Sequence, residues 1–205
     1  MELKPHDLLE IKGVENLICY SNIPKWVETA LLNAPYVVVR RARAPEGLVA
    51  VGVRGSMRNE RFAAFLPVNQ IVSRITPEQL ALEKKWRNYP EDIFRYLESV
   101  SELMNRYSLI WGPGGSVGFE LASGKKTVKV TSDIDVVIRL SEGFTIELAR
   151  EVKSGLEKIP VQVDVQVETL EGAFSLSEYV ASEGQSILIR TMDGPILKQV
   201  DILTF

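Results

Sequence analysis

The pattern of apolar and polar positions divides the chain into a strand-rich first part and a second part in which strands alternate with helices. Residues 35–42 and 47–55 are rich in valine, and the turn-forming string Arg-Ala-Pro-Glu-Gly leads from one to the other, which predicts a hairpin. Further along the chain, Thr76 is a favourable N-cap and Pro77 a favourable first residue for a helix over 76–86.

The string Asn-Tyr-Pro at 88–90 interrupts the helical pattern, as a proline and the residue before it commonly do. We place a domain boundary between about residues 80 and 90. The prediction is a smaller N-terminal α+β domain with a basic hairpin over residues 1–80, followed by a second domain over residues 88–205.

In the second domain, apolar spacings of three and four residues predict helices, and strict alternation predicts strands. The clearest alternation is at 160–168, where valines alternate with polar residues. The expected elements are strands at 108–111, 128–140 and 160–168, and helices at 90–107, 116–123 and 144–159. This order of strands and helices indicates a mixed α+β protein whose helices pack on a sheet.

The composition restricts the chemistry that the protein can perform. Its one cysteine, Cys19, cannot form an intramolecular disulfide and fits a reducing cytoplasm. Its one histidine, His6, excludes zinc clusters of His and Cys and argues against a Ser-His-Asp triad. A metal would therefore need oxygen ligands, which suit Mg²⁺, Mn²⁺ or Ca²⁺. No segment resembles a signal peptide or a membrane span, so we expect a cytoplasmic protein without a membrane role.

The net charge of −3 is unevenly distributed. Residues 1–80 carry ten basic and eight acidic side chains, and the remainder carries 14 basic and 19 acidic ones. Six arginines fall between Arg40 and Arg61, with two glutamates among them. This segment is either a solvated strand edge or a surface that faces phosphates or an acidic partner.

A pair of aspartates is the main candidate for chemistry. Asp133 and Asp135 are two residues apart in a predicted strand, so both carboxylates would lie on one face. Asp164, on the polar side of the strand at 160–168, could join them as a third ligand. Adjacent carboxylates repel one another, and a divalent cation relieves that repulsion. The opposite, core-facing side of the first strand would hold Ile134, Val136 and Ile138.

A glycine-rich loop, Trp-Gly-Pro-Gly-Gly-Ser at 111–116, precedes the aspartate pair. Gly114 and Gly115 would let backbone N–H groups approach a polyphosphate, and Ser116 would add a hydroxyl donor at a helix N-terminus. Two rival motifs fail. A dinucleotide-binding fingerprint would need glycine where Val117 stands, and a P-loop would need glycine where Phe119 stands.

Other conspicuous side chains have simpler interpretations. His6 is interpreted as a capping or packing residue ahead of a short helix. Trp26, Trp86 and Trp111 are assigned to the core or to a domain interface. Because the arginine-rich segment has few aromatic residues and the chain is acidic overall, a nucleic-acid role is disfavoured.

The ordered set of glycine loop, Asp-x-Asp strand and later aspartate resembles the nucleotidyltransferase superfamily, with its polymerase-beta-like fold. Pro-His-Asp-Leu-Leu-Glu-Ile at 5–11, the string at 115–124 and Thr-Ser-Asp-Ile-Asp-Val-Val-Ile-Arg-Leu at 131–140 narrow the resemblance. They are similar to the malonate decarboxylase holo-acyl-carrier-protein synthases, also called phosphoribosyl-dephospho-coenzyme A transferases. The resemblance spans nearly the whole chain and makes residues 88–205 a nucleotidyltransferase-like catalytic domain.

This resemblance implies a specific reaction. Triphosphoribosyl-dephospho-coenzyme A would donate its phosphoribosyl-dephospho-coenzyme A group to a serine of the acyl carrier protein subunit of malonate decarboxylase, and pyrophosphate would leave. The catalytic aspartates of the family fall on Asp133 and Asp135, which with Asp164 would hold Mg²⁺ or Mn²⁺. One aspartate, with Asp164 as a candidate, would help to deprotonate the serine.

Arginines among Arg40, Arg41, Arg54, Arg58 and Arg61 are candidates to neutralise phosphate or to dock an acidic carrier protein, and Arg54 and Arg58 are the two assigned to substrate binding. Two alternatives stay open. The protein could be a metal-dependent nucleotidyltransferase with a small molecule or another protein as acceptor, or it could be a catalytically silent nucleotide-binding module. The intact aspartates argue against the silent module.

Overall fold

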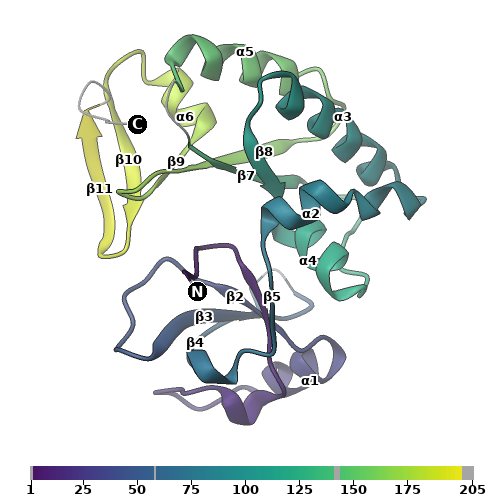
Figure 1. Cartoon of the computed structure of the whole chain (residues 1–205), viewed down its shortest axis with the longest axis vertical. Helices are drawn as coiled ribbons and strands as arrows, with labels where there is room; N and C mark the ends of the chain where they lie inside the picture. Colours follow the sequence, from purple (N-terminus) through teal and green to yellow (C-terminus); the bar gives the residue numbers. More distant parts are fainter. Residues whose placement is uncertain (1, 58, 141–143, 200–205) are drawn as a thin grey trace.

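The computed structural model describes residues 2–57, 59–140 and 144–199 and folds them around two separate β-sheets. Figure 1 shows the first sheet with helix α1 in the lower lobe, and the second sheet with the remaining helices in the upper lobe. The predicted mixed α+β class is confirmed.

The N-terminal sheet has five strands in the order β4-β3-β2-β1-β5. Helix α1 (Lys25–Asn33) buries Val27 and Leu31 against one face of it. The predicted hairpin is confirmed, because β2 pairs with β3 in antiparallel fashion. The strands are β1 (Leu8–Glu10), β2 (Tyr36–Val39), β3 (Leu48–Arg54), β4 (Arg61–Pro67) and β5 (Ser73–Ile75), with 3-10 turns at Val14–Asn16 and Val68–Gln70.

The second sheet has six strands in the order β11-β10-β9-β8-β7-β6. Strands β7 and β8 are parallel, and the other neighbouring pairs that the structure describes in this sheet are antiparallel. The strands are β6 (Ile110–Pro113), β7 (Ile134–Arg139), β8 (Val163–Glu168), β9 (Ala173–Ser175), β10 (Ser186–Thr191) and β11 (Gly194–Gln199). The helices are α2 (Pro77–Glu83), α3 (Asp92–Arg106), α4 (Gly115–Ser123), α5 (Ile146–Leu156) and α6 (Leu176–Ala181), with a 3-10 turn at Lys85–Asn88. None of the helices in the described part of the chain is long and apolar enough to cross a bilayer.

Several predicted elements are shorter in the structure than expected, including α3, α5 and β8, and two cases have a clear local cause. Helix α2 begins at Pro77 with the expected cap, a reciprocal pair of hydrogen bonds between Thr76 and Gln79, but it ends at Glu83. The strand expected over 128–140 begins only at Ile134, so its first half was predicted wrongly. Two local contacts account for this. The buried carboxylate of Glu120 accepts the N–H groups of residues 127 and 128 at 2.7 and 2.8 Å, and Lys129 and Ser132 close a turn in which each N–H donates to the other residue at 2.9 Å.

The two faces of the second sheet have different roles. The prediction that Ile134, Val136 and Ile138 face the core is confirmed, since they join the apolar cluster of α3 and α5. Trp86 and Trp111 are buried in the same cluster, as predicted. The opposite face of β7 and β8 carries charged side chains and lies toward the N-terminal domain (Figure 1).

Candidate active site

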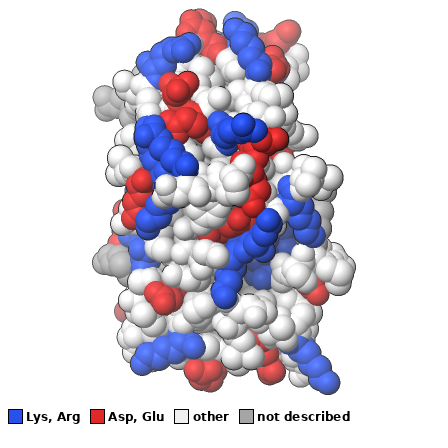
Figure 2. Space-filling model, turned by 90° about the vertical axis from the view of Figure 1, so that its right-hand side faces the viewer, with Lys and Arg blue, Asp and Glu red and all other residues white. Residues whose placement is uncertain are grey.

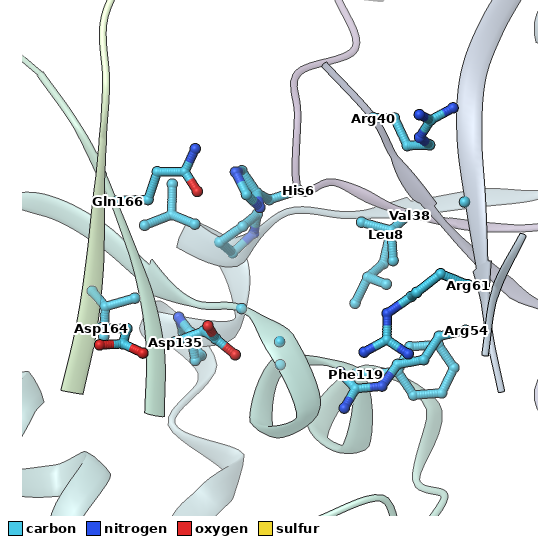
Figure 3. Close-up of a pocket in the computed structure, with 18 of the residues that line it drawn as sticks. His6, Leu8, Val38, Arg40, Arg54, Arg61, Phe119, Asp135, Asp164 and Gln166 are labelled. Atoms are coloured by element: carbon cyan, nitrogen blue, oxygen red, sulfur yellow. The ribbon is translucent and has the colours of Figure 1, made fainter. Parts of the chain in front are cut away.

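A cavity of about 780 Å³ lies between the two sheets and is lined by both domains. The N-terminal wall comes mainly from β3, β4 and the chain before β1, and the second wall from β7, β8 and the start of α4. Figure 3 shows this cavity with its labelled carboxylates on one side and the labelled arginines on the other. In Figure 2, acidic and basic side chains meet near the middle of the molecule, where the two domains join.

The acidic wall is built from two neighbouring parallel strands. Asp135 on β7 is the register partner of Asp164 on β8, and both side chains line the cavity. Burial raises the pKa of Asp135, and the nearby carboxylates of Asp133 and Asp164 raise it further. Asp164 is exposed, and both of its oxygens accept hydrogen bonds from Gln162 Nε2, at 3.0 and 3.2 Å. This wall therefore concentrates negative charge that a cation would stabilise.

Asp133 lies in the loop just before β7 and does not line the cavity itself. Its charge nevertheless acts on Asp135 and on Arg54 across the cavity. In the described residues, no three His, Cys, Asp or Glu side chains form a complete metal-binding group. The acidic wall still fits Mg²⁺, because this ion usually takes one or two carboxylates and completes its shell with water and substrate phosphates.

The glycine loop packs directly against Asp135. Gly115 has a φ of +54°, and a Cβ on it would lie 1.7 Å from Asp135 Oδ2. The N–H of Gly114 donates to the backbone oxygen of Asp135 at 2.9 Å. Glycine is needed at position 112 for a different contact, because an added Cβ would lie 2.0 Å from the backbone of Pro77. The glycines therefore allow close backbone contact, and one of them fits against the Asp135 carboxylate.

The first turn of α4 faces the cavity through Gly114, Gly115 and Gly118. The N–H of Gly114 donates to Asp135 and that of Gly118 donates to the oxygen of Gly114 at 2.7 Å, so of these three glycines Gly115 has the N–H group that a first helical turn can offer to an anion. Ser116 is only 4 % exposed and is not among the residues lining the cavity. Gly114 and Gly115 therefore line the same cavity as Asp135 and Asp164. Ser116 is buried and does not line it, unlike the sequence-based expectation.

The basic wall contains a pair of arginines on the hairpin of β3 and β4. Arg54 and Arg61 are direct register partners, so two like charges lie opposite one another and both line the cavity. Burial lowers the pKa of Arg54, and the charge of Arg61 lowers it further. Like charges at such positions destabilise a sheet, which makes the pair a candidate anion site. Arg58, also predicted to contact substrate, lies outside the described residues.

The polar face of β8 ends in a buried charge cluster that sequence reasoning missed. Glu168 is 6 % exposed, and Arg41 of the N-terminal domain donates to both of its carboxylate oxygens. His6 Nε2 lies 3.0 Å from Glu168 Oε1, and Arg139 Nη1 lies 3.5 Å from Oε2. Burial alone would raise the pKa of Glu168, but the hydrogen bonds from His6 and Arg41 outweigh it and lower the pKa.

His6 is the main correction to the interpretation of the sequence. It precedes a strand, β1, and it lines the cavity, so the expected capping or packing role ahead of a helix is wrong. Its φ of 75° is left-handed, which is strained for a residue other than glycine and costs on the order of 1–3 kcal/mol. One signal was present in the sequence: the alternation over 160–168 places Glu168 on the same face as Asp164.

The fold and site define a class of two-domain α+β protein with an interdomain cavity that sets carboxylates against arginines. The family described as phosphoribosyl-dephospho-CoA transferase MdcG matches through its N-terminal domain at residues 4–77 and its C-terminal domain at residues 79–201. The chain therefore belongs to this family, and the sequence resemblance to phosphoribosyl-dephospho-coenzyme A transferases is confirmed, while the polymerase-beta-like fold stays a prediction.

Curated relatives agree with this assignment. A phosphoribosyl-dephospho-CoA transferase of Pseudomonas syringae pv. tomato is 36 % identical over 192 residues, which cover 93 % of this chain and 89 % of the relative. Proteins with the same description from Pseudomonas putida and Azotobacter vinelandii are 36 % and 34 % identical, covering 95 % and 93 % of this chain and 92 % and 90 % of those proteins. No solved structure matches the chain significantly.

Proposed function

We propose that this protein transfers phosphoribosyl-dephospho-coenzyme A from its triphosphate precursor to a serine of the acyl carrier protein subunit of malonate decarboxylase. A phosphodiester forms and pyrophosphate leaves, so the transfer is of the nucleotidyl type. Membership of the phosphoribosyl-dephospho-CoA transferase family supports the donor group. The observation that carries the mechanism is the cavity with Asp135 and Asp164 on one wall and the Arg54–Arg61 pair on the other.

The two walls have complementary tasks in this proposal. The arginine pair binds the anionic phosphates of the donor and stabilises the negative charge of the departing pyrophosphate. The first turn of α4 adds backbone N–H groups beside Asp135. Because the cavity lies between two domains, the donor's reacting phosphate can be held in line with an incoming hydroxyl.

We further propose that Asp135, with Asp133 or Asp164, holds Mg²⁺ or Mn²⁺ against the donor phosphates. The bound cation would neutralise charge on the phosphates and on the leaving group. Burial, and after it the repulsion from Asp133 and Asp164, raises the pKa of Asp135; a bound cation would relieve this repulsion, which supports the assignment. Chelation with EDTA should abolish transfer and added Mg²⁺ should restore it, whereas full activity in metal-free buffer would contradict the metal but not the transfer.

The reaction is tested by incubating the enzyme with Mg²⁺, triphosphoribosyl-dephospho-coenzyme A and the apo carrier protein. Intact-protein mass spectrometry should show one prosthetic group added per carrier, with an equal amount of pyrophosphate released. If the mass of the carrier stays unchanged although the enzyme is folded and all components are present, the proposal is overturned. Modification of a different acceptor would instead favour a nucleotidyltransferase with another substrate.

The phosphate-binding role of the arginine pair has a matched control. Arg54→Gln or Arg61→Gln removes one cation that lines the cavity and should raise the donor KM roughly 10- to 100-fold, as expected for losing a charged hydrogen bond. Arg95 on α3 is exposed and lies outside the cavity lining, so Arg95→Gln should leave the donor KM unchanged. If Arg95→Gln changes the donor KM as much as Arg54→Gln or Arg61→Gln does, the arginine pair has no specific role.

A further inference from the structure

His6 is held in the cavity by contacts that fix both its backbone and its ring. Its N–H donates to the oxygen of Val39 at 3.0 Å, and the N–H of Val39 donates to the oxygen of Asp7 at 2.8 Å. The Asp7 side chain is fully buried and lies 2.8 Å from Arg74 Nε. The left-handed backbone at His6 is therefore imposed by its neighbours, which is a pattern associated with functional positions.

The contact with Glu168 determines which ring nitrogen can accept a proton. Glu168 is ionised under ordinary conditions because its pKa is lowered, so its oxygen accepts a hydrogen bond from His6 Nε2 at 3.0 Å. In a neutral imidazole the proton then resides on Nε2, and Nδ1 is the accepting nitrogen. This pairing of a carboxylate with an imidazole orients the ring and fixes which nitrogen carries the proton.

The ring belongs to the same cavity as the acidic wall. His6, Asp135 and Asp164 all line it, and the charge of a protonated His6 is near enough to act on Asp135. Figure 3 shows His6 beside Gln166 and above the two aspartates, on the side of the cavity away from Arg54 and Arg61. A nucleophile entering beside His6 would face a phosphate whose leaving group points toward the arginine pair, as an in-line displacement needs.

We infer that His6 accepts the proton of the attacking serine hydroxyl, with Glu168 as its positioning residue; this inference rests on the proposed transfer reaction. The serine O–H bond breaks and its proton passes to His6 Nδ1. The serine oxygen forms a bond to the α-phosphorus, and the bond from that phosphorus to pyrophosphate breaks. Pyrophosphate leaves with the electron pair, and His6 returns the proton to solvent.

Asp164 is the competing proton acceptor, and its surroundings make it the weaker one. Gln162 donates to both of its oxygens, and it lies opposite Asp135 where a cation and phosphates would engage it. Both Asp164 oxygens therefore already accept hydrogen bonds, which leaves less room for the proton of a serine hydroxyl. His6, by contrast, keeps one nitrogen directed away from its carboxylate partner.

The test compares His6→Gln and His6→Gly with the wild-type enzyme in single-turnover transfer to the carrier. Glutamine can donate to Glu168 but cannot act as the base, so the rate constant should fall roughly 100-fold while the donor KM stays within roughly threefold. Glycine adopts the left-handed backbone freely and leaves space for a ring. Added imidazole should therefore accelerate His6→Gly roughly tenfold or more and leave His6→Gln unchanged.

Three results would overturn the inference. The first is wild-type transfer by folded His6→Gln, and the second is a loss of rate in His6→Gly that imidazole does not restore. If the variants do not fold, diethyl pyrocarbonate on the wild-type chain provides the third, because His6 is its single histidine. Enzyme modified at His6 should lose transfer activity. Full transfer activity after modification would contradict the role of His6 as proton acceptor. Failure of the unmodified wild type to load any carrier would instead overturn the proposed function.

Discussion

Adding one methyl group at Gly115 tests whether the position of Asp135 matters for catalysis, beyond any effect on the stability of the fold. In Gly115→Ala the new Cβ would lie 1.7 Å from Asp135 Oδ2 and 2.9 Å from Asp135 Cβ. Rotating the carboxylate relieves only the first overlap, so the backbone of the loop or of β7 has to move as well. The alanine also has to adopt a φ of +54°, which costs about 1–2 kcal/mol.

Gly124, at the other end of the same helix, provides the matched control. It has a φ of +67° and no atom within 4 Å of an added Cβ. Gly124→Ala therefore carries the same backbone cost without the collision. Gly124→Ala should lose about 1–2 kcal/mol of unfolding free energy in urea, and Gly115→Ala should lose at least as much because the collision adds to the backbone cost. A displacement of about 1 Å at a reacting group slows catalysis roughly 100-fold, so only Gly115→Ala should lose transfer to that extent.

The assay is carrier loading followed by mass spectrometry at saturating donor, on both alanine variants and the wild-type enzyme. A Gly115→Ala protein that loads the carrier within roughly threefold of Gly124→Ala would refute the reasoning. That result would mean that the loop tolerates a side chain, and that the contact between Gly115 and Asp135 has no functional consequence.

Three further predictions concern charge. Asp135→Asn should slow transfer roughly 1,000-fold, equivalent to about 4 kcal/mol. Because burial raises the pKa of Asp135, its stability contribution is lost as pH rises, and the variant should resist urea at pH 7 at least as well as the wild type. Arg41→Met leaves buried Glu168 with only His6 and the more distant Arg139, and should cost about 3 kcal/mol of unfolding free energy. Arg43→Met, whose ion pair with Asp193 is exposed, should lower the unfolding free energy much less. A hydrogen bond from an arginine lowers the pKa of Glu98 from 4.5 to about 2, so thermal scans should show stability lost as pH falls through that interval, and less so in Glu98→Gln.

Local sequence patterns were enough to predict several elements of the fold. Period-two alternation placed Ile134, Val136 and Ile138 on the core face of β7, and it placed Asp164 on the polar face of β8. Thr76 and Pro77 identified the start of α2 because capping depends on residues within one turn. Where side chains bind nearby backbone N–H groups instead, as Glu120 does at residues 127 and 128 and Ser132 does at Lys129, the same kind of pattern predicted a strand over residues that do not form one.

The acidic half of the site was likewise within reach of the sequence, whereas the other half required the tertiary structure. Asp135 and Asp164 follow from alternation on two strands, and the family resemblance followed from strings in the sequence. The sequence made Arg54 and Arg61 candidates for phosphate binding, but nothing local places them opposite these aspartates, or indicates that His6 reaches Glu168 across 162 positions of the chain. Those contacts exist because the N-terminal sheet packs over the polar face of the second sheet. Such packing depends on how two whole surfaces fit together, and short-range periodicity carries no information about that fit.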